Sequence, residues 1–375
     1  MPVYLDYSAT TPVCSEVAEL VTRLMVDEFG NSGSRTHEFG VQAKRAVEKA
    51  RQQIAEVVGA DKSEVTFTSG ATESDNIALL GLEVEGLKTG KKHIISSAIE
   101  HKAVLEPLGV LESRGFEVTY LKPEENGRIS AEALSGSLRS DTLLVSLMHV
   151  NNETGVVQDL DGYCAALEGH SAYLHVDAAQ SFGKIIAPLR NPRIDLISVS
   201  GHKIYAPKGI GALVARRRGY QRVPLKPLMY GGGQEKGLRP GTLPVPLIAG
   251  LGLTAELALK NHEARMASCS EIKAQAIEAL SSLGAVYNGN GSAPYILNFS
   301  IPGVNSEAAI VALKDLVAIS NGSACTSSSY TPSHVLTAMG LSEDLVEGAL
   351  RFSWSHEAKD IPWREVCERL SALKV

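Results

Sequence analysis

A regular alternation of strand and helix patterns between residues 64 and 215 constrains the fold of this chain more than any other feature. Seven short apolar runs are typical of strands: 65–68, 93–97, 116–121, 143–150, 173–176, 196–199 and 211–215. Helical spacing occurs between them, at 71–87, 102–114 and 160–167. Strands that alternate with helices predict an α/β fold with a mainly parallel seven-stranded sheet covered on both faces. Ligands of such sheets bind at the carboxyl ends of the strands.

The segments that flank this region predict a second, smaller domain. Helical spacing covers 13–29 and 35–58, and a Pro/Gly-rich stretch at 240–246 leads into one long predicted helix, 247–283. The remaining segments mix strand patterns at 296–300, 317–319 and 350–354 with helical patterns at 307–314, 333–338 and 362–373. We expect a large domain at 13–255 and a smaller α+β domain made of 1–12 and 256–375.

Charge and cysteine usage exclude several classes of function. The 375 residues carry a net charge of -6, and we interpret the densest basic run, Arg216-Arg217-Arg218, as a solvated strand end rather than a nucleic-acid surface. We expect neither a signal peptide nor a membrane span, because no apolar run reaches the ~18 residues that a span needs. The five cysteines are scattered and form no C-x-x-C pair. They therefore predict no disulfide framework and no metal site, and indicate a reducing cytoplasm.

Reactive side chains follow two successive strand patterns. Asp177 ends the run His175-Val176-Asp177, and Lys203 follows the next run in the sequence Ser200-Gly201-His202-Lys203. A lysine amine can hold the aldehyde of pyridoxal phosphate, and a carboxylate can keep the cofactor's ring nitrogen protonated, so that the ring accepts electrons. The pair predicts a pyridoxal phosphate site. Taken alone, a lysine is nonspecific and a carboxylate after a strand could cap a helix.

Three further motifs follow strand patterns and could serve the same ligand. The turn Thr68–Ser74 opens a helix and could seat a phosphate, although any Ser or Thr there would also make an ordinary N-cap. His101 could stack on a cofactor ring and exchange protons, or be structural. Asn152 offers a donor and an acceptor, but local sequence equally favours a turn residue.

Cys325 and Arg351 are the notable residues near the C-terminus. Cys325 lies in the stretch Asn321–Ser329, whose Gly and Ser residues predict a flexible, exposed loop in which the thiol is reachable. An incidental loop cysteine is the alternative. Arg351 interrupts an apolar strand pattern, which is costly unless the guanidinium meets an anion such as a carboxylate.

Taken together, these residues resemble the NifS/IscS-like cysteine desulfurases of the class V aminotransferase group. The matching motifs cover almost the whole chain: Tyr4–Thr11, Thr68–Glu73, Ile99–Lys102, His149–Gly155, His175–Gln180, Ser200–Lys203, Gly231–Thr242 and Gly322–Ser327. The resemblance implies a homodimer with pyridoxal phosphate fold type I. It also implies transfer of sulfur from L-cysteine to an enzyme cysteine, with release of L-alanine.

The resemblance also implies a role for each site residue. Lys203 would hold the cofactor, His101 would stack on its ring, and Asp177 and Gln180 would contact its ring nitrogen and phenolic oxygen. The phosphate would be held by Ala71, Thr72, Ser200 and His202, with Thr242 added from the other subunit. Asn152 and Arg351 would bind the substrate carboxylate. Cys325 would carry the sulfur as a persulfide.

Several segments are most similar to the desulfurases of DNA phosphorothioation systems, among them 143–155, 227–246 and 332–336. This similarity implies that the sulfur acceptor is a DNA-modification protein or an iron–sulfur protein. Two other hypotheses remain open. The chain could be a selenocysteine lyase or another aminotransferase-like enzyme, which would not need Cys325, or an idle assembly platform.

Overall fold

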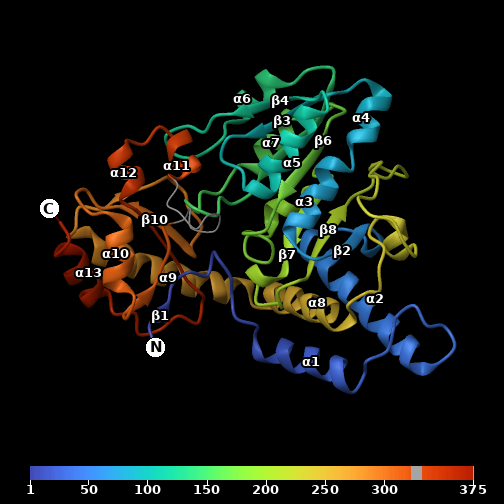
Figure 1. Cartoon of the computed structure of the whole chain (residues 1–375), viewed down its shortest axis with the longest axis horizontal. Coiled ribbons are helices and arrows are strands. Elements are labelled where there is room, and N and C mark those ends of the chain that lie inside the picture. The colour runs from blue at the N-terminus through green and yellow to red at the C-terminus, as the bar shows by residue number, and fades with distance from the viewer. Residues whose placement is uncertain (322–331, 375) are drawn as a thin grey trace.

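The computed structural model describes residues 1–321 and 332–374. A seven-stranded sheet lies at the centre of the larger lobe, with the order β2-β8-β7-β6-β5-β3-β4 (Figure 1). Its strands are β2 (Val65–Thr68), β3 (His93–Ser97), β4 (Glu117–Leu121), β5 (Thr142–Met148), β6 (Tyr173–Asp177), β7 (Leu196–Ser200) and β8 (Gly211–Ala215). The strand β8 runs antiparallel to the other six, which all point the same way. The predicted α/β fold with a mainly parallel sheet is therefore confirmed.

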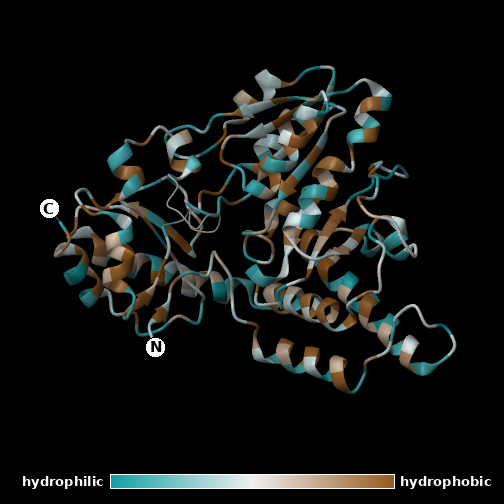
Figure 2. Cartoon of the chain, in the orientation of Figure 1, coloured by the Kyte–Doolittle hydropathy of each residue, from teal (hydrophilic) through white to brown (hydrophobic). Residues whose placement is uncertain are grey.

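Apolar side chains of this sheet pack on both of its faces, and helices cover both. Figure 2 shows apolar residues along the strands and in the helices around them. One face packs against α2 (Glu38–Val58), α7 (Leu160–Ala166) and α8 (Val245–Lys260). The other packs against α3 (Ala71–Leu80) and α5 (Lys102–Ser113). The remaining helices of this lobe are α1 (Ser15–Val26), α4 (Glu83–Thr89) and α6 (Ala131–Ser137). Coverage on both faces explains why the central strands read as continuous apolar runs.

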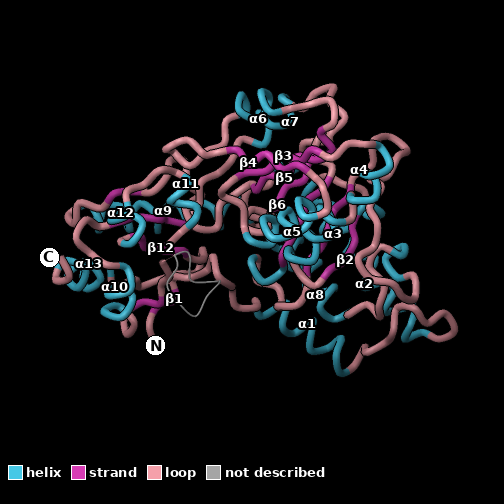
Figure 3. Tube along the Cα trace, turned by 45° about the horizontal axis from the view of Figure 1, so that its top comes forward, coloured by secondary structure: helices cyan, strands magenta, loops and turns pink. Residues whose placement is uncertain are grey.

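The smaller lobe has its own hydrophobic core, which includes Leu5, Phe299 and Trp354. An antiparallel sheet of β9 (Val286–Tyr287), β10 (Ile296–Ser300) and β12 (Ala349–Ser353) forms its centre. The short strand β1 (Val3–Tyr4) pairs with β11 (Val317–Ala318), so the N-terminal arm joins this lobe (Figure 3). Its helices are α9 (His262–Ser281), α10 (Ser306–Leu313), α11 (His334–Ala338), α12 (Glu343–Glu347) and α13 (Trp363–Ser371).

Two predicted helices are each divided in the structure. The stretch 247–283 is not one helix, because α8 ends at Lys260 and α9 begins at His262, with Asn261 between them. The two parts pack against different cores, and Asn is a weak helix former. The stretch 71–87 breaks near Gly81 for a similar reason, since Gly is the poorest helix former after Pro. Among the described residues, no helix is both long and apolar enough to cross a lipid bilayer.

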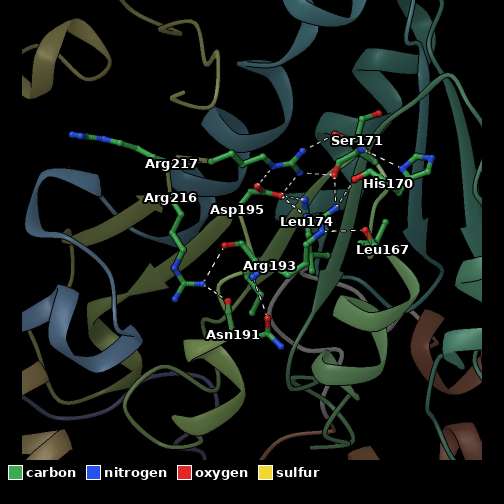
Figure 4. A network of polar contacts seen from close by, with 12 residues as sticks. Leu167, His170, Ser171, Leu174, Asn191, Arg193, Asp195, Arg216 and Arg217 are labelled. Carbon is green, nitrogen blue, oxygen red and sulfur yellow. Dashed lines mark hydrogen bonds and ion pairs between the residues drawn. The ribbon is translucent and has the colours of Figure 1, made fainter. Parts of the chain in front are cut away.

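A buried polar network lies at the amino end of β7, at the edge of the sheet opposite the strand ends that carry the predicted site (Figure 4). Asp195 bonds the guanidinium groups of Arg193 and Arg218 at 2.9 and 2.7 Å. Arg216 donates to the carbonyls of Asn191 and Leu189 at 2.6 and 2.8 Å and is only 6% exposed. The interpretation of this arginine run as a solvated strand end was therefore wrong for Arg216, because its guanidinium satisfies carbonyls where several segments end.

Candidate active site

A cavity of about 670 Å³ lies at the carboxyl ends of the sheet strands. Ten of the twelve predicted site residues line it: Ala71, Thr72, His101, Asn152, Asp177, Gln180, Ser200, His202, Lys203 and Arg351. They follow β2, β3, β5, β6 and β7, except for Arg351, which comes from β12 of the smaller lobe. The chain reverses direction across the sheet between β3 and β5, and such a reversal opens a crevice for a ligand.

Lys203 is oriented by the N-terminal arm. Its Nζ donates to the carbonyl of Ala9 at 2.9 Å and to the carbonyl of Ser8. The arm is held against this turn by the amide of Thr11, which donates to the carbonyl of His202 at 2.9 Å, and by Oγ1 of Thr11, which accepts from the amide of Tyr205. The amine is thus fixed at the cavity wall by backbone acceptors.

Asp177 and Gln180 share one turn after β6. The Asp177 carboxylate accepts from the amide of Ala179 at 2.9 Å, and burial, together with the charge of Asp75, raises its pKa to about 6. The Gln180 side chain donates to the carbonyl of Ser8 at 2.9 Å. Its buried Oε1 has no hydrogen-bond partner within the described part of the chain. A buried, unpartnered amide oxygen beside a cavity indicates a place for a polar ligand.

His101 both caps a helix and lines the cavity. Its Nδ1 accepts from the amide of Ala103 at 3.1 Å, so the imidazole caps the start of α5. Burial lowers the pKa of the ring, and the Asp177 charge opposes this effect only in part. The imidazole is therefore neutral at pH 7 and lines the cavity as a flat, polarisable wall.

The start of α3 forms an open seat for an anion. No side chain caps this helix, so its first amide groups and positive dipole end point toward the cavity beside Ala71 and Thr72. The strand β8 approaches closely here: a Cβ on Gly211 would lie 2.6 Å from the Cα of Gly70. Ser200 and His202 complete the seat, and burial together with the Lys203 charge lowers the pKa of His202 to about 4.

Arg351 and Asn152 form a second polar group on the cavity wall. Arg351 is 1% exposed and donates to the carbonyl of Asn152 at 2.8 Å and to the carboxylate of Asp6 at 2.7 Å. Its Nε has no partner among the described residues. A buried guanidinium with an unused donor suits a small carboxylate ligand.

Two predicted residues lie elsewhere. Thr242 lines a separate cavity of about 340 Å³, together with residues such as Arg51 and Lys62. Cys325 and the loop predicted around it lie outside the described residues, so its exposure stays a prediction.

Sequence reasoning missed three residues that line this cavity, Asp75, Lys208 and Ser8, and a fourth, Asp6, that pairs with Arg351 of its wall. Asp75 lies on α3 one turn after Ala71, and Lys208 follows the Lys203 turn. Ser8 and Asp6 act from the N-terminal arm, through a backbone carbonyl and through an ion pair. An acidic residue among the apolar residues of α3 was the available signal for Asp75. Backbone carbonyls leave no signal in a sequence.

These residues fit pyridoxal phosphate. The cavity combines a lysine at the wall, a buried carboxylate, a neutral imidazole and an uncapped helix start. The unused Oε1 of Gln180 and Nε of Arg351 leave hydrogen-bonding capacity for the cofactor and for an acid substrate.

Comparison with known proteins gives concordant similarities. The family model described as aminotransferase class-V matches residues 3–361. A protein named cysteine desulfurase IscS from Serratia proteamaculans (strain 568) is 49% identical over 358 residues, which cover 94% of this chain and 88% of that protein. The crystal structure of DndA from Streptomyces lividans is 53% identical with a TM-score of 0.83, and the match covers 94% of this chain and 99% of that one. A structure of SspA in complex with cysteine is 40% identical, also with a TM-score of 0.83, and covers 94% and 98% of the two chains.

Proposed function

The chain belongs to the aminotransferase class-V family and is a pyridoxal phosphate-dependent cysteine desulfurase, and we propose that Lys203, Arg351 and Cys325 divide its reaction among them. In the overall reaction, L-cysteine and an enzyme thiol give L-alanine and an enzyme persulfide. The carbon–sulfur bond of the substrate breaks and a sulfur–sulfur bond forms. The thiol sulfur supplies the electron pair for the new bond, and the electron pair of the broken bond stays on the substrate carbon, which takes up a proton. The carbon is thus reduced as the sulfur is oxidised, and no external oxidant is needed.

The cavity at the strand ends supports this proposal most directly. Lys203 would hold the cofactor, Asp177 its ring nitrogen and Gln180 its phenolic oxygen. Ala71, Thr72, Ser200 and His202 would hold its phosphate. When bound, pyridoxal phosphate supplies an electron sink next to the α-carbon of an amino acid. Asp177 would face the ring nitrogen as a carboxylate, because a protonated ring nitrogen lowers the pKa of that acid again.

Arg351 and Asn152 would orient the substrate. The guanidinium would take the α-carboxylate with its unused Nε, while Asp6 keeps the other edge of the fork fixed. This orientation brings the α-hydrogen of the substrate toward Lys203, whose Nζ would remove it as a base. His101, neutral at the cavity wall, would pass a proton to the product.

Cys325 would accept the sulfur. A thiolate is the reactive form of cysteine, and Cys325 would attack the substrate sulfur as such. The other four cysteines fit this role poorly. Cys164 and Cys269 are buried, and burial raises the pKa of each thiol to about 11. Burial also raises the pKa values of the half-buried thiols Cys14 and Cys367.

The position of Thr242 favours a homodimer in which each subunit completes the other's site. Thr242 lines a cavity separate from the one that holds Lys203, so a role at the phosphate would require the cavity of a partner subunit. A holoenzyme that light scattering finds to have the mass of one 39.9 kDa chain would contradict this arrangement.

The sulfur acceptor we propose is a cytoplasmic protein of DNA phosphorothioation, or its iron–sulfur cluster. The 53% identity to DndA supports this assignment, as does the resemblance of several segments to desulfurases of that system. The net charge of -6 fits a chain that serves nucleic acid through a protein partner. Labelled sulfur that passes from Cys325 to no such protein would argue against it.

Release of alanine from L-cysteine tests the role of Cys325. In the holoenzyme with a reductant present, Cys325→Ala should lose at least 100-fold in turnover while the yellow cofactor remains bound, because no thiolate is left to take the sulfur. Cys14→Ala, a change at a half-buried thiol, is the matched control and should keep wild-type turnover. Equal alanine release by Cys325→Ala and wild type would instead favour a lyase or an aminotransferase.

A further inference from the structure

Asp75 is a buried carboxyl that the proposed reaction does not use. It lies on α3 one turn after Ala71, lines the same cavity as Asp177 and is 0% exposed. Neither of its oxygens forms a hydrogen bond of good geometry within residues 1–321 and 332–374, although the hydroxyl of Ser198 lies close enough to lower its pKa. No lysine or arginine among these residues forms an ion pair with it. An ionised carboxyl in this position would be costly, because no lysine or arginine in the described part of the chain neutralises it.

The nearest titratable group is His175. Its Nε2 lies 3.4 Å from Oδ1 of Asp75, and both side chains are 0% exposed. The imidazole is held between two hydroxyls, Ser146 at 2.8 Å from Nδ1 and Ser198 at 2.9 Å from Nε2. Burial lowers the pKa of His175 to about 4. Two neutral groups in contact avoid a buried ion pair, so one proton shared by Asp75 and His175 satisfies both.

The other groups around Asp75 come from three elements. Asp177 follows His175 on β6, Lys203 follows β7, and Glu100 and His101 lie in the turn before α5. The charge of Asp75 raises the pKa values of both Asp177 and Glu100. Burial raises the pKa of Asp75 to about 7 against the opposing effect of the Ser198 hydroxyl, and burial is also the main cause that raises the pKa of Glu100 to about 8. The buried carboxyls of Asp75, Asp177 and Glu100 cannot all be ionised together, because a charge on one raises the pKa of a neighbour.

We propose that Asp75 and His175 hold one proton between them, so that Asp177 carries the only negative charge among the three carboxyls Asp75, Glu100 and Asp177. Asp75 is then a positioning residue that acts through Asp177. This inference rests on the proposed function of Asp177 as partner of the ring nitrogen. The inference adds Asp75 as a second carboxyl of the site, which the site requires in its neutral form.

The sign of the pH effect follows from the raised pKa of Asp75. Below about pH 7 the acid keeps its proton, and above that pH the proton is lost. The second negative charge then lies beside Asp177 in a cavity that must also admit a phosphate. Affinity for pyridoxal phosphate should therefore fall as the pH rises from 7 to 9, and the part of this fall that Asp75 causes should be absent when residue 75 cannot ionise.

Asparagine has the shape of a protonated aspartic acid but cannot ionise, so Asp75→Asn tests the proposal. The measured quantity is the dissociation constant of pyridoxal phosphate from apoenzyme, at pH 6.5 and pH 9. Between these pH values the dissociation constant of the wild type should rise at least fivefold more than that of Asp75→Asn. Every other group of the site is the same in both proteins, so the difference between their pH dependences isolates residue 75.

Asp159→Asn is the matched control, because it removes one charge at an exposed N-cap position that asparagine also suits. It should follow the wild type at both pH values. If Asp75→Asn does not fold, Asp75→Ser, which also cannot ionise, gives the same comparison. The same pH dependence in the wild type and in the Asp75 variants would overturn the proposal. A wild type that binds no pyridoxal phosphate at either pH would instead overturn the site on which the proposal rests.

Discussion

The adjacent residues Asn151 and Asn152 after β5 have different roles, because different atoms of the two residues form their hydrogen bonds. Oδ1 of Asn151 accepts from the amides of Glu153 and Thr154, both at 2.9 Å, so this side chain fixes the turn. Asn152 lines the cavity, and its carbonyl accepts from Arg351 at 2.8 Å. The turn therefore leaves the side chain of Asn152 available for a ligand, while its backbone carbonyl links it to the guanidinium of Arg351.

This coupling predicts the effect of Arg351→Ala. The variant should lose about 100-fold or more in kcat/KM for L-cysteine, mainly through KM, because an unpaired substrate carboxylate at a buried position costs several kcal/mol. The bound cofactor should keep its absorbance, since Arg351 contacts Asp6 and Asn152 rather than the predicted phosphate seat.

Steady-state kinetics with a parallel melting curve provide the measurement. Arg369→Ala removes an arginine whose partner, Asp315, is exposed, and it should leave KM unchanged. A wild-type KM in a folded Arg351→Ala protein would exclude Arg351 from substrate binding.

At this scale the sequence identified side chains at or after strand ends, and nine of these line one cavity together with Arg351. It could not separate the turn role from the binding role of Asn152, because both produce the same local pattern. Asp75 was missed because the groups that define its role, His175 and Asp177, lie about 100 positions away in the chain.

At the scale of elements, the sheet is held at its amino edge by the network around Asp195 (Figure 4). The Asp195 side chain is 4% exposed, bonds Arg193 and Arg218, and also accepts from the amide of Leu174 at 2.7 Å. Asp195 thereby joins β6, β7 and the segment that follows β8 at the amino edge of the sheet.

Asp195→Asn should lower the free energy of unfolding by about 2 kcal/mol, since it removes the buried anion that the partly exposed guanidinium groups of Arg193 and Arg218 share. Asp315→Asn is the control, because the Asp315 side chain is 62% exposed in its pair with Arg369. An exposed pair contributes at most about 1 kcal/mol. Denaturant unfolding measures both, and equal effects of the two substitutions would contradict the role given to Asp195.

The elements that sequence predicted best are the strands covered on both faces, whose apolar runs are long and unbroken. The helices α6 and α12 and the strand β9 were missed because they have only seven, five and two residues. Periodicity over so few residues is weak. The break at Asn261 depends on two separate cores, which no local pattern contains.

At the scale of the molecule, the site is assembled from both lobes and the N-terminal arm. The arm contributes Ser8 to Thr10, the sheet contributes its strand ends, and the smaller lobe contributes Arg351 (Figure 1). The resemblance to the cysteine desulfurases implied the fold type and the residues of this site. The division of the chain into 13–255 and the remainder stays a prediction.

The most direct test of the account is to identify the lysine that carries the cofactor. Borohydride reduction of the yellow holoenzyme, followed by digestion and mass spectrometry, should find the pyridoxal phosphate mass on the peptide of Lys203. Lys208 lines the same cavity and so provides an internal comparison. Label on Lys203 alone would establish the site from which the proposed reaction was derived, and label on Lys208 in its place would contradict the account.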